Sequence, residues 1–298
     1  MSPIPRLLFA AALLAPVIGV AQRPLKVYIS VDMEGIAGVV TNEQLGPTGF
    51  EYQRARQFMT DELNAAIQGA RDAGATQILV SDSHGNGQNV LIDQLPNDVT
   101  IIRSWPRPLM MMEGIDSTFD AALFLGYHAG TASVNGVRAH TMSSATLTGV
   151  SLNGTQMPEG GINAAIAGHF GVPIVMVSGD DATIEEVRRF TGPIEGAQVK
   201  RAISFHAAAT MTPKAAQEII RQRAKAGVER RASVRPFRLG TSIALEVSFK
   251  NYRAAEIVAY LPNITRVNSH TIRFVGRDMV EVSRFLEFLN TYQPDLSP

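Results

Sequence analysis

Short apolar runs alternate with helical patterns along this chain, and that alternation limits the folds open to it. Four such runs occupy residues 26–31, 77–80, 121–125 and 173–177. Segment 51–73 lies between the first two runs; its apolar side chains recur at a helical period, and Gly74 follows as a helix stop. Segment 161–170 also has a helical pattern. Apolar runs joined by helices are typical of parallel strands that are buried on both faces. The sequence therefore predicts an α/β fold with a largely parallel sheet flanked by helices.

The second half of the chain continues this pattern and then changes. We expect a helix at 183–190, a strand at 197–203, a helix at 212–231, a strand at 243–249, a helix at 254–261, a strand at 271–275 and a helix from Asp278. Thr183 and Glu186 have the spacing of a capping box, which predicts the start of the first of these helices. The later strands alternate apolar and polar residues, as in a sheet with one solvated face. This predicts an α/β domain at 22–203 and a smaller α+β C-terminal domain at 204–298, with the boundary inside 200–240.

The first residues have the layout of a signal peptide. Arg6 precedes an almost uncharged apolar run at 7–20, and small residues close the segment 1–21. The run has about 14 residues, and a membrane-spanning helix needs about 20. We therefore expect an exported protein, periplasmic or secreted, without stable membrane insertion. A retained anchor is the alternative.

Charge and cysteine content exclude several classes of function. The chain has 27 basic and 27 acidic residues and no charge run, so it lacks the basic surface expected of a nucleic-acid-binding protein. It has no cysteine, which excludes disulfides, thiolate metal sites and a cysteine nucleophile. Any metal must be bound through nitrogen and oxygen.

Acidic and imidazole side chains follow three of the predicted strands. Asp32 and Glu34 come after the first strand, His84 after the second and His128 after the third. The carboxyl ends of strands in an open α/β sheet are where ligands gather. Residues two apart in an extended segment point the same way, so both carboxylates can face one site. Each residue alone is as readily a helix cap or a turn former. Together they predict a metal-dependent hydrolase or a phosphate-handling α/β protein, with zinc as the commonest metal for this ligand set.

Several sequence blocks extend this interpretation. They are residues 27–36 (VYISVDMEGI), 81–84 (SDSH), 113–116 (EGID), 123–129 (LFLGYHA), 137–142 (VRAHTM), 158–163 (PEGGIN), 179–181 (GDD) and 251–252 (NY). In order and approximate spacing they resemble the bacterial zinc-dependent D-aminopeptidase family. The resemblance covers essentially the whole chain after the leader, and the SVDMEG and GYHA blocks are its specific parts.

The resemblance implies a site with two zinc ions. Asp32 would bridge them, and the remaining ligands would be Glu34, His84, His128 and Glu159. It also places the catalytic residue at His140, as nucleophile, proton shuttle or oxyanion stabiliser, although this histidine could also act only as a hydrogen-bond donor beside the ligands. Three carboxylates against two dications leave about one net positive charge, which suits the stabilisation of developing negative charge.

The implied function is hydrolysis of short peptides with an N-terminal D-amino acid, such as D-Ala-D-Ala, by metal-activated water in a ring-shaped homo-oligomer. Two other readings stay open: another dinuclear amidase or phosphoesterase, and a catalytically silent envelope protein that binds peptides or metal. Three further aspartates, Asp82, Asp180 and Asp181, are expected to orient the ligand imidazoles. The other histidines are expected to have no role in the site.

Overall fold

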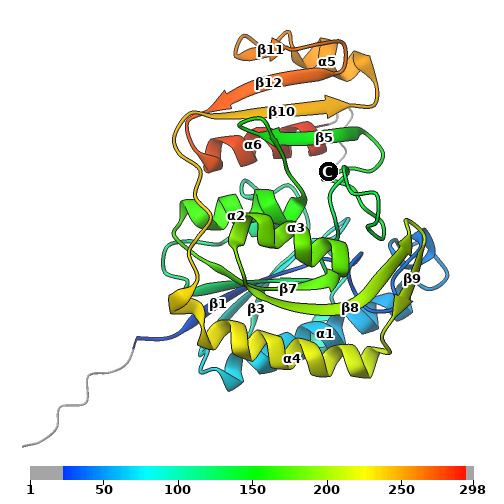
Figure 1. Ribbon diagram of the computed structural model, residues 1–298, viewed down its shortest axis with the longest axis vertical. Coiled ribbons are helices and arrows are strands. Elements are labelled where there is room, and N and C mark those ends of the chain that lie inside the picture. The colour runs from blue at the N-terminus through cyan, green and yellow to red at the C-terminus, as the bar shows by residue number, and fades with distance from the viewer. Residues whose placement is uncertain (1–22, 293–298) are drawn as a thin grey trace, which may run out of the picture.

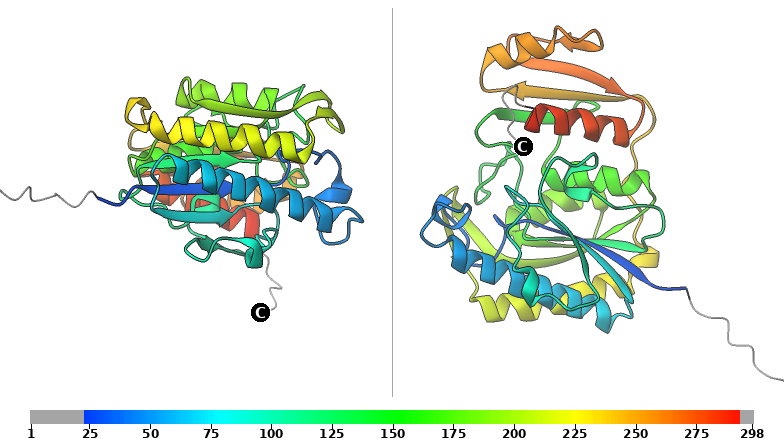
Figure 2. Two further views of the ribbon diagram at one scale, coloured as in Figure 1. Left: turned by 90° about the horizontal axis from the view of Figure 1, so that it is seen from below. Right: turned by 180° about the vertical axis from the view of Figure 1, so that it is seen from behind.

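The computed structural model describes residues 23–292, and in it the helices and two sheets stack in layers (Figure 1). One pair of helices covers the outer face of the larger sheet, a second group of helices lies between the two sheets, and one short helix covers the smaller sheet (Figures 1 and 2). No helix within residues 23–292 has the length and hydrophobicity that a membrane span needs. The predicted signal peptide at 1–21 lies outside the described residues.

The larger sheet has seven strands in the order β3-β2-β1-β4-β7-β8-β9. Their bounds are β1 Lys26–Val31, β2 Gln77–Asp82, β3 Thr100–Ile102, β4 Ala121–Leu125, β7 Ile174–Asp180, β8 Glu195–Ser204 and β9 Ala207–Thr210. All neighbours pair in parallel except β9, which is antiparallel to β8. The predicted α/β class with a largely parallel sheet is therefore confirmed.

Four helices cover the two faces of this sheet. They are α1 Tyr52–Asp72 and α4 Pro213–Glu229 on the outer face, and α2 Glu159–His169 and α3 Asp181–Thr191 on the face toward the smaller sheet (Figure 1). The central strands β4 and β7 are buried along their whole length, as their continuous apolar sequence requires. Helices α1 and α4 touch closely because Gly69 has no side chain, and a Cβ there would lie 2.3 Å from Arg221 O.

The smaller sheet is antiparallel, with strand order β11-β12-β10-β5-β6. Its strands are β5 Leu147–Leu152, β6 Thr155–Gln156, β10 Ile243–Phe249, β11 Ile264–Arg266 and β12 Thr271–Gly276, and its helices are α5 Tyr252–Val258 and α6 Met279–Thr291. Short 3-10 turns complete the structure at η1 Asn42–Gln44, η2 Ile92–Gln94, η3 Met110–Met112 and η4 Arg231–Ser233. Strand β10 alternates buried and half-buried side chains, as the alternating sequence predicts.

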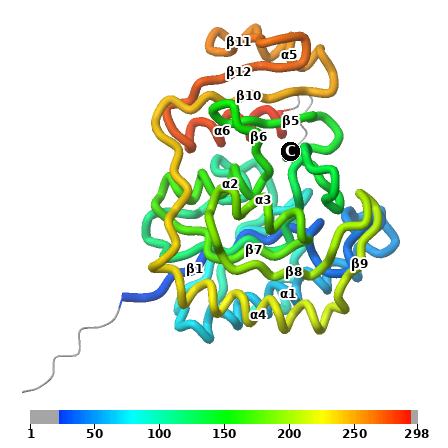
Figure 3. Tube along the Cα trace, viewed as in Figure 1, coloured from blue at the N-terminus to red at the C-terminus, as the bar shows by residue number. Residues whose placement is uncertain are grey.

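The two sheets do not divide at the predicted domain boundary of 203/204. Strands β5 and β6 lie within 22–203, yet they belong to the smaller sheet. Strand β9 and helix α4 lie inside the predicted boundary range of 200–240 and belong with the larger sheet, since β9 extends that sheet and α4 packs against α1 and β8. The trace crosses between the sheets before β5, after β6 and again after α4 (Figure 3).

The start of α3 differs from the sequence prediction. Asp180 is the N-cap, and its Oδ1 accepts the backbone N–H of Thr183 at 2.8 Å. Thr183 therefore lies inside the helix, and Glu186 is used elsewhere, because its Oε2 accepts the backbone N–H of Gly130 at 2.7 Å. The capping box predicted at Thr183 and Glu186 is wrong, since aspartate at the end of β7 is an equally good cap three residues earlier.

Replacing Glu62 by glutamine should flatten the dependence of stability on pH. Glu62 is fully buried in α1, its Oε1 accepts the backbone N–H of Ala37 at 2.9 Å, and burial raises its pKa to about 8. In the unfolded chain Glu62 loses its proton near the ordinary glutamate pKa of 4.5, whereas in the native protein it keeps the proton up to about pH 8. Between these two pKa values, the free energy of unfolding therefore falls by up to about 1.4 kcal/mol for each pH unit. The melting temperature of Glu62→Gln relative to the parent should rise from pH 5 to about pH 8. If the melting temperatures of Glu62→Gln and the parent change with pH in parallel, this prediction is wrong. Glu218→Gln, on the surface of α4, is the control.

Candidate metal centre

The six predicted site residues meet at the C-terminal edge of the larger sheet. Asp32 and Glu34 follow β1, His84 follows β2, and His128 follows β4. Glu159 is the first residue of α2 and His140 lies in the loop that leads to β5. Asp32, Glu34, His84, His128 and Glu159 are each at most 7% exposed.

A close backbone approach brings the first carboxylates to His128, the histidine that follows β4. Asp32 N donates to Leu125 O at 2.8 Å, and Gly35 N donates to Gly126 O at 2.7 Å. A Cβ at Gly35 would lie 2.0 Å from Tyr127 O, so only glycine fits there. The glycine of the DMEG block therefore allows the two ligand-bearing turns to touch.

Lys200 holds the same turn from the other side, and sequence reasoning missed it. This buried side chain donates from Nζ to the carbonyls of Val39 at 2.6 Å, Ile36 at 3.1 Å and Glu34. Its burial lowers its pKa to about 8. In the sequence, Lys200 is only a lysine inside a predicted strand. Its partners are more than 160 residues away, so residue spacing does not reveal them.

Asp32 lies between two imidazoles. His84 Nδ1 is 3.2 Å from Asp32 Oδ1 and 2.8 Å from Glu34 Oε2. His128 Nε2 is 3.4 Å from Asp32 Oδ2 and 3.4 Å from Glu159 Oε1. The Asp32 carboxylate thus lies between the pair His84–Glu34 and the pair His128–Glu159. A ligand that bridges two metal ions requires such a position.

Backbone carbonyls fix the orientation of all three histidines. His84 Nε2 lies 2.7 Å from Leu45 O, His128 Nδ1 lies 3.0 Å from Ala129 O, and His140 Nδ1 lies 2.7 Å from Arg138 O. A carbonyl oxygen only accepts, so each of these nitrogens carries the hydrogen and the other nitrogen keeps its lone pair toward the carboxylates in the neutral ring.

The aspartates that were expected to orient these imidazoles contact backbone N–H groups instead. Asp82 accepts the backbone N–H groups of Asn89 and Val90, Asp180 caps α3, and Asp181 accepts the backbone N–H of Ala202. The prediction that these aspartates orient the imidazoles is wrong, because backbone carbonyls accept the ring N–H groups of the three histidines. Such carbonyls leave no signal in the sequence.

The donor set fits a metal. Among the described residues, Asp32 Oδ2, Glu34 Oε2 and His128 Nε2 are buried without a hydrogen-bond partner. Ligand atoms of Asp32, Glu34 and His128 lie within 4.8 Å of one another, as do those of His128, His140 and Glu159. Unpaired buried acceptors are costly, and a cation bound by nitrogen and oxygen would satisfy them.

The charges of the cluster depend strongly on one another. Burial, and then the charge of Glu34, raises the pKa of Asp32 to about 7. Although burial opposes it, Glu159 and Asp32 raise the pKa of His128 to about 10, and Glu34 and Asp32 raise that of His84 well above its usual range. In the absence of metal the carboxylates thus keep protons on the imidazoles, and metal binding would release those protons.

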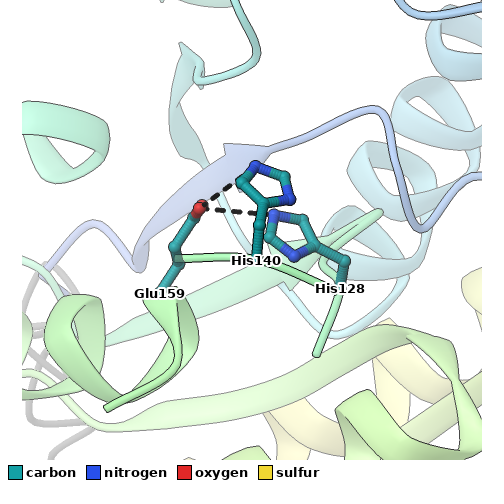
Figure 4. Close-up of side chains that lie close together, drawn as sticks. All are labelled: His128, His140 and Glu159. Carbon is teal, nitrogen blue, oxygen red and sulfur yellow. Dashed lines mark ion pairs between the residues drawn. The ribbon is translucent and has the colours of Figure 1, made fainter. Parts of the chain in front are cut away.

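His140 lies beside His128 and Glu159 (Figure 4), and it lines the cavity next to the cluster. Its ring stacks on that of His128 at 4.0 Å, and its Nε2 lies 3.7 Å from Glu159 Oε1. Its side chain is 16% exposed against 1% for His128. Burial and the charge of His128 lower its pKa, so this imidazole is neutral near pH 7. The cavity measures about 270 Å³ and also contacts the loop at 142–145.

The remaining histidines are exposed and stand apart from the cluster: His169, His206 and His270. His206 Nδ1 lies 3.3 Å from Arg138 Nη1, and His270 Nδ1 lies 3.0 Å from Phe249 O. Neither contact involves a carboxylate, so these residues have no metal-binding geometry.

Comparisons with known proteins match this chain to D-aminopeptidases. The family model described as D-aminopeptidase matches residues 25–288. A curated D-aminopeptidase of Bacillus subtilis (strain 168) is 34% identical over 261 residues, which is 86% of this chain and 93% of the relative. Among solved structures, the zinc-dependent D-aminopeptidase DppA of Bacillus subtilis, described as a self-compartmentalizing protease, is 31% identical with a TM-score of 0.85 and covers 89% of this chain and 96% of its own.

Proposed function

Since this chain belongs to the D-aminopeptidase family of metallopeptidases, we propose that it is an exported di-zinc aminopeptidase that removes N-terminal D-amino acids from short peptides such as D-Ala-D-Ala. The observation that carries the proposal is the buried cluster in which Asp32 lies between two imidazole–carboxylate pairs. The zinc dependence of the similar Bacillus subtilis structure supports the choice of metal.

Five side chains would hold the two ions. Asp32 would bridge them, with Glu34 and His84 on one side and His128 and Glu159 on the other. Zinc supplies a Lewis acid that polarises the scissile carbonyl and lowers the pKa of water. The backbone N–H of Met142, which donates to Glu159 Oε1 at 2.7 Å, keeps that carboxylate in place.

His140 would move the protons of the reaction. Its Nδ1 hydrogen is held by Arg138 O, so Nε2 is available to accept a proton from the attacking water and to return it to the leaving amine. The ring of His140 stacks on that of His128 and is largely buried, and this burial lowers its pKa, so a proton accepted at Nε2 is held weakly. This favours rapid return of the proton.

The assembly and location are part of the proposal. The self-compartmentalizing relative supports a ring-shaped homo-oligomer, and the signal-like layout of residues 1–21 supports export to the periplasm or beyond. A phosphoesterase would need basic side chains around the cavity to hold phosphate, and the lining of the metal cavity contains neither lysine nor arginine among the described residues.

Metal content and stereospecific cleavage test this function together. Elemental analysis of the purified chain should give about two zinc per chain, and D-alanine should be released from D-Ala-D-Ala much faster than L-alanine from the L-isomer. Metal without cleavage of either dipeptide would point to another amide or a phosphoester. A protein without metal would favour a peptide-binding role.

A further inference from the structure

The loop that carries His140 touches the tip of the β8–β9 hairpin. This tip is the turn formed by Phe205 and His206, between the ends of β8 and β9. The backbone N–H of Arg138, two residues before His140, donates to Phe205 O at 3.0 Å. The hairpin and the loop that leads from β4 to β5 lie side by side (Figure 1). The edge of the larger sheet thus reaches the segment that places His140.

The side chain of Arg138 also packs on this tip. Its guanidinium carbon lies 4.9 Å from the centroid of the Phe205 ring, which is within the range of a cation–π contact. Its Nη1 lies 3.3 Å from His206 Nδ1, and because a guanidinium has only donors, Nη1 donates to that nitrogen. Arg138 is 9% exposed and Phe205 is 37% exposed, so a surface ring covers a buried arginine. We call Arg138, Phe205 and His206 the hairpin clamp.

Few other groups hold the guanidinium. Arg138 Nε is buried without a hydrogen-bond partner among the described residues. No carboxylate of residues 23–292 forms an ion pair with Arg138. Glu34 acts on it from a greater distance, since burial lowers the pKa of Arg138 and the charge of Glu34 opposes that effect. The contacts that fix this side chain are therefore those with Phe205 and His206.

The backbone of Arg138 has an unusual conformation. Its φ is 56°, in the left-handed region that residues with a side chain seldom adopt. Such a conformation persists only where the surrounding contacts outweigh its cost. Its neighbours are anchored on both sides, because Val137 N donates to Asp180 Oδ2 at 2.7 Å and His140 N donates to Ala129 O at 3.0 Å. The clamp holds the strained residue between these two anchors.

The carbonyl of Arg138 links the clamp to His140. Arg138 O accepts the Nδ1 hydrogen of His140 at 2.7 Å, and Nε2 of the same ring lies 3.7 Å from Glu159 Oε1. The N–H of Arg138 contacts the hairpin tip while its C=O contacts the imidazole. A change in the backbone of this one residue therefore changes the orientation of the ring.

We propose that Arg138, held by Phe205 and His206 at the tip of the β8–β9 hairpin, is a positioning residue that fixes the His140 imidazole for proton transfer. The proposal rests on the proposed aminopeptidase function, in which His140 moves the protons. Among the described residues the metal cavity is lined by His140 and not by Arg138, so the effect of Arg138 passes through His140.

Kinetics of two variants test the clamp from its two sides. Arg138→Gly removes the side chain, and glycine adopts the positive φ readily, so the fold should be retained. Its kcat for D-Ala-D-Ala should fall about tenfold or more, with KM and zinc content at the parent values, because a small displacement of a catalytic group is enough for such a loss. Phe205→Ala should lower kcat about threefold or more, and Phe205→Tyr, which keeps the ring, should restore the parent value.

Two exposed side chains of the same hairpin serve as controls. Arg201→Ala removes an arginine from β8, and Ile203→Ala removes an apolar side chain that is 64% exposed. Both variants should match the parent in kcat, zinc content and oligomer size. A loss of kcat in either control equal to that in Arg138→Gly would overturn the specific role of the clamp.

A double-mutant cycle shows whether Arg138 acts through His140. In the His140→Ala background, Arg138→Gly should lower kcat by less than about twofold, because the group that it positions is already absent. A role in stability alone, or an effect of the guanidinium charge on Glu34, would lower kcat by the same factor in both backgrounds. That result would overturn the proposal.

A chemical measurement tests the clamp without relying on activity. Diethyl pyrocarbonate acylates the neutral nitrogen of an imidazole, and its reaction with the zinc-loaded protein can be followed for each histidine by peptide mass spectrometry. The His140 side chain is 16% exposed. Its rate of acylation should rise about threefold or more in Arg138→Gly and in Phe205→Ala, because the loop opens more often. The exposed His169 should react at the parent rate in every variant.

The outcomes separate this proposal from the proposed function. If the parent cleaves D-Ala-D-Ala and neither kcat nor the acylation of His140 changes in the clamp variants, the clamp is overturned and the peptidase function stands. Faster acylation without a loss of kcat would also overturn it, since the orientation of His140 would then not matter for the reaction. Faster acylation in variants of a parent that cleaves neither dipeptide would support the clamp and refute the peptidase function.

Discussion

Replacing Asp32 by alanine should lower kcat/KM for D-Ala-D-Ala by about a thousandfold or more and release bound zinc. The side chain of Asp32 lies between two imidazoles that are predicted to be ligands, His84 at 3.2 Å and His128 at 3.4 Å. Its loss removes a ligand shared by the two predicted ions, whereas loss of Glu34 or Glu159 affects one side only. Activity should be measured by release of D-alanine and zinc by elemental analysis of the same sample.

A control variant and the expected stability of Asp32→Ala allow this result to be interpreted. Asp93→Ala removes an exposed aspartate from η2 and should leave both activity and zinc unchanged. The metal-free parent contains several buried carboxylates that repel one another, so Asp32→Ala should not unfold the chain. Full activity with full zinc content in Asp32→Ala would refute the bridging role.

Replacing His140 by alanine should lower kcat by about a hundredfold to ten-thousandfold while zinc content stays at the parent level. The imidazole lies at the cavity surface with Nε2 3.7 Å from Glu159 Oε1, and the neutral ring can exchange a proton there. The two measurements together distinguish a proton carrier from a ligand, which matters because His140 also lies within metal-binding distance of His128 and Glu159.

Each outcome for His140 has a separate meaning. Loss of about half the zinc would make His140 a ligand, and unchanged kcat with unchanged zinc would remove it from the mechanism. His169→Ala, an exposed histidine at the end of α2, controls for the loss of an imidazole and should match the parent.

The sequence predicts the larger sheet and the ends of its strands well because both depend on local patterns. Continuous apolar runs identify β1 and β4, and the residues that follow them, Asp32, Glu34 and His128, fall at one edge as the parallel topology requires. The position of Glu159 at the start of α2 came from family resemblance, since a glutamate before a helix has many uses.

Features that depend on contacts distant in sequence could not be predicted. Lys200 is 161 residues from Val39, and the pairing of β5 with β10 joins segments about 95 residues apart. Neither leaves a periodic signal. The same is true of the contact between α6 and the loop before η3, where the backbone N–H of Arg107 donates to Glu287 Oε1 at 3.0 Å.

The crossing of the chain between the two sheets has a consequence for how this fold can change over evolution. Strand β5 needs β10 as a partner, β8 needs β9, and the loop between β4 and β5 carries His140 from one sheet to the other. Recombination at residue 203 would leave each half with an unpaired strand edge. The smaller sheet is thus not a module that a gene fusion can add or remove, and an insertion between His128 and His140 would shift one imidazole against the other. Variation in such proteins is therefore expected to concentrate in surface segments such as β11 and α5, which end before α6 and carry none of the side chains that contact the metal cluster.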